Sequence, residues 1–219
     1  MRRIEISGTL KHHMWSFQGN PHPRVEVSEL PTLATLPYRV YAQAIYTPMQ
    51  ASTYLETAAH LYPDRIKVDE LPLERLFTDA VVLKVPLGAG EKITAPALSQ
   101  ALQSLGVPLR KGDSLLVGTG WDKKWDDPDY FRGAPYFSAE AMDWILAHEI
   151  GILGADSPQW DNLEDPQGFF PQFFETETLL LAPLINLSQV SQPRVKLITL
   201  PLKVGGVCAA PCRAIVIEE

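Results

Sequence analysis

Three apolar runs in the middle of the chain, separated by two amphipathic segments, constrain the fold more than any other feature of the sequence. The runs are DAVVLKVPL (79–87), DSLLVGTGW (113–121) and GILGAD (151–156). Each is short and nearly continuous in apolar residues, which is typical of strands that are buried on both faces. Their spacing leaves room for one helix between successive runs and therefore predicts a strand–helix–strand–helix–strand core.

The two intervening segments carry helix start and stop signals. Segment 95–105 follows Thr94, which we expect to be its N-cap, and precedes Gly106, a typical C-terminal stop. Segment 139–149 has an amphipathic pattern, and we expect Ser138 to cap it. Both segments are therefore predicted to be helices that pack against the buried strands.

Strand patterns flank this core on both sides. They lie at 2–8, 25–30, 38–47, 178–187, 195–204 and 212–219. No linker, repeat or low-complexity segment separates them from the core. The sequence of 219 residues therefore predicts a single α/β domain, 1–219, with mixed β-sheets and a few helices.

Charge and hydropathy exclude several classes of partner. The formal net charge is −7 and no stripe of Lys and Arg occurs, so a nucleic-acid-binding face is not expected. No apolar stretch approaches the roughly 18 residues of a membrane span, and Arg2 and Arg3 lead into a strand pattern and not into a signal peptide. We expect a cytoplasmic protein whose partner is a small-molecule substrate, without nucleic acid or membrane.

The segment QASTYLETAAH (50–60) concentrates side chains that bind metals or move protons. If residues 50–56 are extended, Gln50, Tyr54 and Glu56 share one face, because side chains alternate along a strand. His60 follows one turn later. Such oxygen and nitrogen donors can hold a divalent cation, but a Gln–Glu pair also occurs at solvated strand ends, and the spacing leaves both interpretations open.

The same segment resembles the signature His-x-Gly-Thr-His-x-Asp-x-Pro-x-His of the cyclase family, which includes bacterial kynurenine formamidase and isatin hydrolase. Thr53 and His60 match outright, and Glu56 stands in place of the aspartate. Gln50 and Tyr54 occupy the positions of two metal-binding histidines. The other two differences are Ser52 for glycine and Ala58 for proline.

The resemblance continues through most of the chain. The similar segments are LLVGTGWDKKWDDPDYF (115–131), GAPYFSAEAMDWILAHEIGILGADSP (133–158), LINLSQV (184–190) and ITLPLKVGGVCAAPCRAIVI (198–217). It implies the swivelling β/β/α fold of the family, assembly into a homodimer or homotetramer, and a divalent cation, manganese or zinc, if the site is retained.

Several site residues of the family are replaced here. Aligned without gaps, a later histidine falls on Phe170 and a later glutamate on Ala182. Glu175 and Glu177 lie nearby, but they would reach the site only after a rearrangement of their loop. The resemblance thus retains Glu56 and His60 as the catalytic residues, and Gln50 completes a weak metal-binding set with them. Because an amide oxygen is a neutral ligand, this set favours manganese, magnesium or calcium over zinc.

Two functions follow from this pattern. In the first, the protein is a hydrolase of a C–N amide or of a cyclic amide or ester. Glu56 then binds or orients the cation or water, and His60 moves the proton. In the second, a family member without hydrolytic activity, and with no bound metal, keeps the pocket for ligand binding or assembly. The lost ligands favour the second function, whereas the retained Thr53, Glu56 and His60 favour the first.

Aromatic residues, cysteines and further histidines are additional candidates for a site. We expect the substrate pocket to include Thr53, Tyr54, Trp15, Phe17 and Trp121, although the aromatic members also fit a core together with Trp125 and Tyr130. Cys208 and Cys212, four residues apart in CAAPC, fit a redox pair, a disulfide or half of a metal site, but small side chains in a hairpin are the favoured interpretation. We assign His12, His13 and His22 to a surface loop and His148 to a helix end.

Overall fold

The computed structural model of the protein describes residues 1–17, 19–30 and 35–219. Its main sheet is mixed. In spatial order its strands are β1 (Arg2–Glu5), β12 (Ala209–Glu218), β11 (Arg194–Pro201), β5 (Phe77–Lys84), β7 (Ser114–Gly118), β9 (Ile152–Ala155), β10 (Leu179–Ala182) and β4 (Tyr54–Glu56). The four strands β5, β7, β9 and β10 are parallel, and the others pair antiparallel.

The sheet closes on itself at β4. This short strand pairs with β10 on one side and with the first residues of β12 on the other. Seven strands therefore form a barrel-like ring, and β1 pairs with the opposite end of β12. The single α/β domain with a mixed sheet that the sequence predicts is confirmed, but the ring closure was not predicted.

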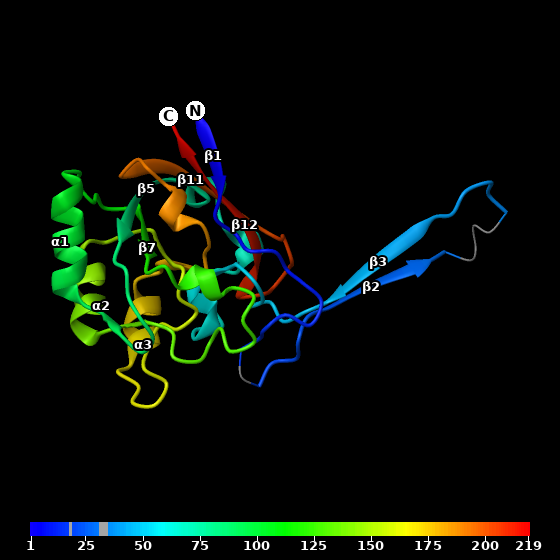
Figure 1. Cartoon of the computed structure of the whole chain (residues 1–219), viewed down its shortest axis with the longest axis horizontal. Coiled ribbons are helices and arrows are strands. Elements are labelled where there is room, and N and C mark those ends of the chain that lie inside the picture. Colours follow the sequence, from blue (N-terminus) through cyan, green and yellow to red (C-terminus); the bar gives the residue numbers. More distant parts are fainter. Residues whose placement is uncertain (18, 31–34) are drawn as a thin grey trace.

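Three helices cover one side of the ring, α1 (Ala95–Leu105), α2 (Ala139–Ala147) and α3 (Phe169–Glu175) (Figure 1). The predicted caps of the first two are confirmed, because the hydroxyl of Thr94 accepts a hydrogen bond from the Ala97 N–H and that of Ser138 accepts one from the Ala141 N–H. Gly106 ends α1 with a φ of 65°, a left-handed conformation that glycine adopts without strain. Helix α3 was not predicted.

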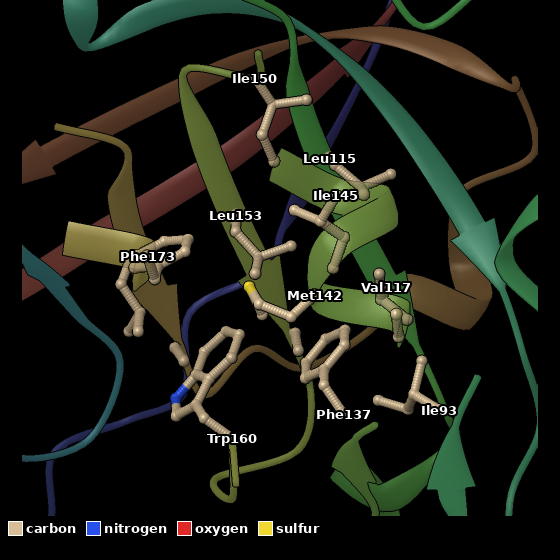
Figure 2. Close-up of a cluster of buried hydrophobic side chains, with 14 of the residues drawn as sticks. Ile93, Leu115, Val117, Phe137, Met142, Ile145, Ile150, Leu153, Trp160 and Phe173 are labelled. Carbon is tan, nitrogen blue, oxygen red and sulfur yellow. The ribbon is translucent and has the colours of Figure 1, made fainter. Parts of the chain in front are cut away.

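Two apolar layers lie on the two faces of the parallel strands, as expected for alternating side chains. Between the strands and the helices, Leu115, Val117 and Leu153 pack against Met142 and Ile145 of α2 (Figure 2). Residues that alternate with these in sequence fill the inside of the ring; they include Ala80, Val82, Leu116, Ile152, Leu181 and Val216. Gly154 belongs to this inner face, where a Cβ would lie 2.7 Å from the Leu116 side chain.

The remaining elements are short. Strands β6 (Lys92–Ile93) and β8 (Tyr136–Phe137) form a small parallel pair. Among the residues that the structure describes, the 3₁₀ helices are η2 (Ala58–His60), η3 (Val68–Glu70), η4 (Leu73–Arg75), η5 (Trp121–Lys124) and η6 (Leu187–Gln189). No helix of the described residues is long and apolar enough to cross a bilayer.

Strands β2 (Arg24–Glu29) and β3 (Tyr41–Tyr46) form a two-stranded ribbon that projects away from the ring (Figure 1). Their pairing places Val25 opposite Ile45 and Glu29 opposite Tyr41. Because directly paired residues share a face, Val25, Val27, Tyr41 and Ile45 lie together on one side. The sequence pattern predicted both strands correctly, but not that they leave the main sheet.

Asp156 follows the end of β9 and holds the turn that follows β7. Its carboxylate, only 1% exposed, accepts hydrogen bonds from the N–H groups of Thr119 and Gly120 at 2.7–2.9 Å and from the Thr119 hydroxyl at 2.7 Å. Burial raises the pKa of Asp156 to about 6, although these donors act in the opposite direction. The Gly118-Thr119-Gly120 turn is thus fixed by a buried carboxylate.

Candidate functional site

Three side chains with metal-binding atoms meet where β4, η2 and the start of β12 come together. They are Glu56, His60 and Cys208, whose donor atoms all lie within 4.8 Å of one another. The Glu56 Oε1 atom lies 3.0 Å from His60 Nδ1, and Cys208 Sγ lies 4.0 Å from the same nitrogen. Glu56 and His60 were predicted to lie together; Cys208 was not predicted to join them.

The local backbone explains this meeting. Thr57 caps η2 by accepting a hydrogen bond from the Ala59 N–H, so that the chain turns directly after β4 and brings His60 back beside Glu56. The N–H and the hydroxyl of Thr57 both donate to the carbonyl oxygen of Cys208, at 2.9 and 3.2 Å. One threonine therefore fixes both the start of η2 and the position of Cys208.

The segment before β4 is bent, and this corrects the prediction that residues 50–56 are extended. Ser52 has a φ of 57°, in the left-handed region that favours glycine, and it stands where the cyclase signature has glycine. Its hydroxyl donates to the Gly8 carbonyl at 2.8 Å. Because of this bend, Gln50 reaches the site by a turn and not by alternation along a strand.

Thr53 and Tyr54 are both buried. The Thr53 hydroxyl donates to the Pro183 carbonyl at 2.5 Å and accepts from the Gly8 N–H at 2.9 Å, so this side chain connects the N-terminal segment to the end of β10. The Tyr54 ring packs against Phe17 with ring centroids 6.3 Å apart, and burial raises the pKa of its hydroxyl well above the ordinary value. Their assignment to a substrate pocket stays a prediction.

Gln50 adds a fourth polar group to the site. Its Nε2 atom lies 2.9 Å from Glu56 Oε1, 3.5 Å from His60 Nδ1 and 3.8 Å from Cys208 Sγ. Gln50 and Cys208 also form part of the wall of a cavity of about 630 Å³, which Asn20, His22, Arg24, Tyr46 and Val207 line as well. The site is therefore accessible to a small molecule from this side.

The charges of the site favour a positive group between the donors. The Glu56 side chain is 3% exposed and that of His60 is 38% exposed. Cys208 and Glu56, both next to Nδ1, raise the pKa of His60 to about 10 against the opposing effect of burial. At neutral pH the metal-free site thus holds a protonated imidazole beside a buried carboxylate.

Phe170 and Ala182, the residues on which two ligands of the family fall in the gap-free alignment, lie near the site, and neither can bind a metal. The Phe170 ring lies 6.1 Å from the ring of His60, and Phe174 lies 5.9 Å from it. Ala182 pairs with Tyr54 across β10 and β4. The positions of the two replaced ligands therefore adjoin the site. At one of them, the rings of Phe170 and Phe174 from α3 form an aromatic wall.

Glu175 and Glu177 do not compensate for these replacements. Glu177 forms an ion pair with Arg65, and Glu175 is exposed at the end of α3. Cys212 lies in the inner layer of the ring, where burial raises the pKa of its thiol to about 12. Both cysteines are free thiols, and only Cys208 reaches the candidate site.

Most of the predicted aromatic wall forms a separate cluster. Trp15 and Trp121 are buried together with Trp125 and Tyr130. The Trp15 N–H donates to the Trp125 carbonyl at 2.6 Å and the Trp121 N–H to the Tyr130 carbonyl at 2.8 Å. Phe17 connects this cluster to Tyr54, so a contact of these rings with substrate stays a prediction.

The predicted placement of the other histidines agrees with the structure in part. His12 and His13 are exposed, with their rings stacked at 4.0 Å. His22 lines the cavity, and its Nδ1 lies 2.8 Å from the Met14 carbonyl oxygen. His148 ends α2, and its Nδ1 lies 2.7 Å from the Trp144 carbonyl oxygen. None of these four belongs to the group of donors around Glu56.

The donor set fits a divalent cation. Carboxylate, imidazole and thiolate are all zinc ligands, and in a tetrahedral site with bonds of about 2.0–2.3 Å neighbouring ligand atoms lie about 3.3–3.6 Å apart. The separations of 3.0 and 4.0 Å from His60 Nδ1 bracket this range. Three protein ligands leave one position for water or substrate, as in catalytic zinc sites.

Comparison with known proteins places these observations in a family and a fold. Residues 4–162 match the family model Cyclase, described as "Putative cyclase". None of the curated protein sequences compared with this chain matches it.

Three solved structures illustrate the similarity of fold. The isatin hydrolase A from Ralstonia solanacearum has a TM-score of 0.84 at 19% identity, over 100% of this chain and 92% of its own. An isatin hydrolase bound to the product analogue thioisatinate gives 0.82 at 19% identity, over 99% and 92%. A structure described as a potential metal-dependent hydrolase with cyclase activity gives 0.78 at 16% identity, over 100% and 99%. At these identities the comparison establishes the fold.

Proposed function

The chain belongs to the Cyclase family, whose model covers residues 4–162, and from this premise we propose that it hydrolyses a C–N amide bond, or a cyclic amide or ester, in a small molecule. The proposed centre consists of Glu56, His60 and Cys208. A divalent cation held by these three residues is part of the proposal. The structural neighbours named as isatin hydrolases support this reaction class, because isatin is itself a cyclic amide.

One observation carries the proposal. Three anionic or basic donor atoms lie within 4.8 Å of one another, and Cys208 is also part of the wall of a cavity large enough for a small substrate. A set of donors that served only the fold would have no need of such access. The combination is typical of an active site.

The cation and the residues around it would have distinct roles in hydrolysis. A bound divalent cation would supply a water of lowered pKa and polarise the carbonyl group under attack. The Glu56 carboxylate lies beside Nδ1 of His60, so both groups would face the cation. No hydrogen-bond partner of His60 Nε2 is found among the described residues, so with Nδ1 on the cation its Nε2–H would donate a hydrogen bond to the leaving nitrogen or oxygen and orient it, while water supplies the proton.

The direct test is hydrolysis of isatin, an aryl formamide and a small lactone by the purified protein, with zinc, with manganese and after treatment with a chelator. We expect turnover of at least one substrate, which falls on chelation and returns with metal. If all three substrates remain intact under all three conditions, the hydrolase proposal is wrong.

A second function, ligand binding without hydrolysis, is favoured by the aromatic wall. Phe170 stands where the family has a histidine, and its ring faces the ring of His60 at 6.1 Å. A site with this replacement keeps a pocket but has fewer ligands than the family signature provides. In the same assay, saturable binding of a substrate without turnover would support this alternative.

Cys208 changes the expected metal. The sequence pattern of Gln50, Glu56 and His60 favours hard cations, whereas a thiolate ligand favours zinc. We expect Cys208→Ser to lower zinc affinity by at least roughly 10–100-fold, since even outer-shell changes have effects of this size. Competition with a chromophoric chelator measures the affinity.

Cys212→Ser is the matched control for this experiment. It makes the same chemical change four residues away, but in the inner layer of the ring, so zinc affinity should stay at the wild-type value. Equal affinities of the wild type and the Cys208→Ser variant would contradict the role of this thiolate.

Assembly with a second copy of the chain is a further part of the proposal. The ribbon of β2 and β3 exposes an apolar face, with Val27 64%, Tyr41 51% and Ile45 57% exposed. A two-stranded ribbon is only marginally stable in water unless its apolar face is covered. We propose that the same surface of another protomer covers it in a homodimer or homotetramer.

Single lysine substitutions on the ribbon test this assembly. Val27→Lys or Ile45→Lys places a charge on the apolar face and should convert the oligomer into monomers at micromolar concentration, as measured by light scattering. Ser28→Lys, on the opposite face of the ribbon, should leave the mass unchanged. A monomeric wild-type protein would refute the proposal.

A further inference from the structure

The amide nitrogen of Gln50 holds a central place in the candidate metal site. It contacts Glu56 Oε1 at 2.9 Å, His60 Nδ1 at 3.5 Å and Cys208 Sγ at 3.8 Å. These are the same three atoms that form the metal-binding group. One nitrogen atom therefore touches every donor that a cation would need.

The chemistry of an amide explains this orientation. The nitrogen of a glutamine side chain only donates hydrogen bonds, and its oxygen only accepts them. Carboxylate oxygen and sulfur are acceptors, so the nitrogen and not the oxygen points at them. With two hydrogens, Nε2 donates to Glu56 and to Cys208 at the same time. In this orientation the nitrogen, and not the oxygen that binds metals, contacts the donors.

The surroundings of Gln50 allow another position. Its side chain is half-buried and forms part of the wall of the cavity of about 630 Å³. The residue precedes the bend at Ser52 and lies outside the paired strand β4. The amide can therefore move into the cavity without any change in the pairing of the ring.

We propose that Gln50 competes with the metal for Glu56, His60 and Cys208 and thereby sets the affinity of the site for a thiophilic divalent cation of the zinc class. This inference rests on the proposed function, because it assumes that these three residues hold the cation. The sequence predicted Gln50 to be a metal ligand, whereas here Gln50 opposes metal binding. A cation enters only when the amide leaves, and the hydrogen bonds lost in that step weaken its binding.

Gln50→Leu tests the inference, because leucine is similar in size but neither donates a hydrogen bond nor binds a metal. Loss of a competitor that makes hydrogen bonds to charged groups should raise zinc affinity about tenfold. Competition with a chromophoric chelator measures this affinity, and the difference in Tm between the metal-free and the zinc-loaded protein should also widen. Neither measurement depends on enzymatic activity.

Asn20→Leu is the matched control. It makes the same change of an amide to leucine in the wall of the same cavity, at a residue outside the donor group, so zinc affinity should not change. Gln50→Ala provides a second variant if leucine at this position disturbs folding, and it should raise the affinity in the same direction.

The outcomes separate this inference from the proposed function. If the wild type binds zinc and both Gln50 variants bind it equally or more weakly, Gln50 is not a competitor, and the inference falls while the metal site stands. If neither the wild type nor the Gln50 variants bind zinc, the metal site itself is wrong and the inference falls with it. Tighter binding by both variants, without a change in the Asn20→Leu protein, supports the inference.

Discussion

Glu56→Gln and His60→Ala are each expected to lower turnover by roughly 100- to 10,000-fold, the usual contribution of a positioned acid–base group. The two side chains touch through Oε1 and Nδ1 at 3.0 Å, so removing either one takes a donor from the proposed cation and leaves the other without its neighbour. Because residues that act as a unit are not additive, the double variant should lose little more than either single variant. The rate of hydrolysis of isatin or an aryl formamide measures the effect.

Glu56→Gln keeps the shape of the side chain at a position that is 3% exposed, but it removes the charge beside the protonated His60, so the free energy of unfolding at neutral pH should also fall. His148→Ala and Glu175→Gln are suitable controls, because they change the same residue types outside the donor group. Wild-type turnover no higher than that of the double variant would contradict a catalytic role and favour binding without hydrolysis.

Asp156→Ala is expected to cause the largest loss of stability, about 3–5 kcal/mol. The substitution leaves two backbone N–H groups and one hydroxyl, those of Thr119 and Gly120, without their acceptor in a buried turn. Denaturant unfolding at neutral pH measures the loss. Asp143→Ala, on the exposed side of α2, should change the free energy of unfolding by less than about 0.5 kcal/mol.

The pH dependence of stability gives a second measure of the same residue. The pKa of Asp156 is raised from 3.8 to about 6 in the folded protein. A raised pKa contributes stability that is fully present below the unfolded value and is lost as the pH rises through the folded value. Relative to Asp156→Asn, the wild type should therefore lose about 3 kcal/mol between pH 3.8 and pH 7. Parallel stability curves for the two proteins would show that this carboxyl has no raised pKa.

The features that the sequence predicted well depend on short-range interactions. Thr94 and Ser138 cap their helices through the N–H groups three residues later, and Gly106 ends α1 by its own backbone freedom. The buried strands β5, β7 and β9 follow from continuous apolar runs. Each of these features is determined by residues that are close in the sequence, so a single sequence contains the information needed to predict it.

The features that the sequence did not predict depend on contacts between segments that are distant in the chain. Cys208 lies 148 positions from His60 in the sequence, and only the pairing of β12 with β4 brings the two together. The spacing of CAAPC did not distinguish Cys208 from Cys212, which the structure places in the inner layer. A useful signal would have been that the strand pattern of 212–219 extends back to residue 209, which places Cys208 directly before the strand.

The prediction of an extended conformation for residues 50–56 is wrong at one residue. Ser52 adopts a positive φ of 57°, and the signature of the family has glycine at this position. A substitution of glycine by serine hides the conformational preference that glycine would have indicated.

The closure of the ring at β4 has a consequence for how such a site can diverge. The strand is held by backbone hydrogen bonds to β10 and β12, and these do not depend on which side chains it carries. Ligand residues can therefore be exchanged one at a time while the scaffold persists, whereas a single inserted or deleted residue would turn Glu56 to the inside of the ring and Leu55 to the outside. This segment therefore tolerates substitutions but not insertions or deletions, and new chemistry can arise here only through substitution.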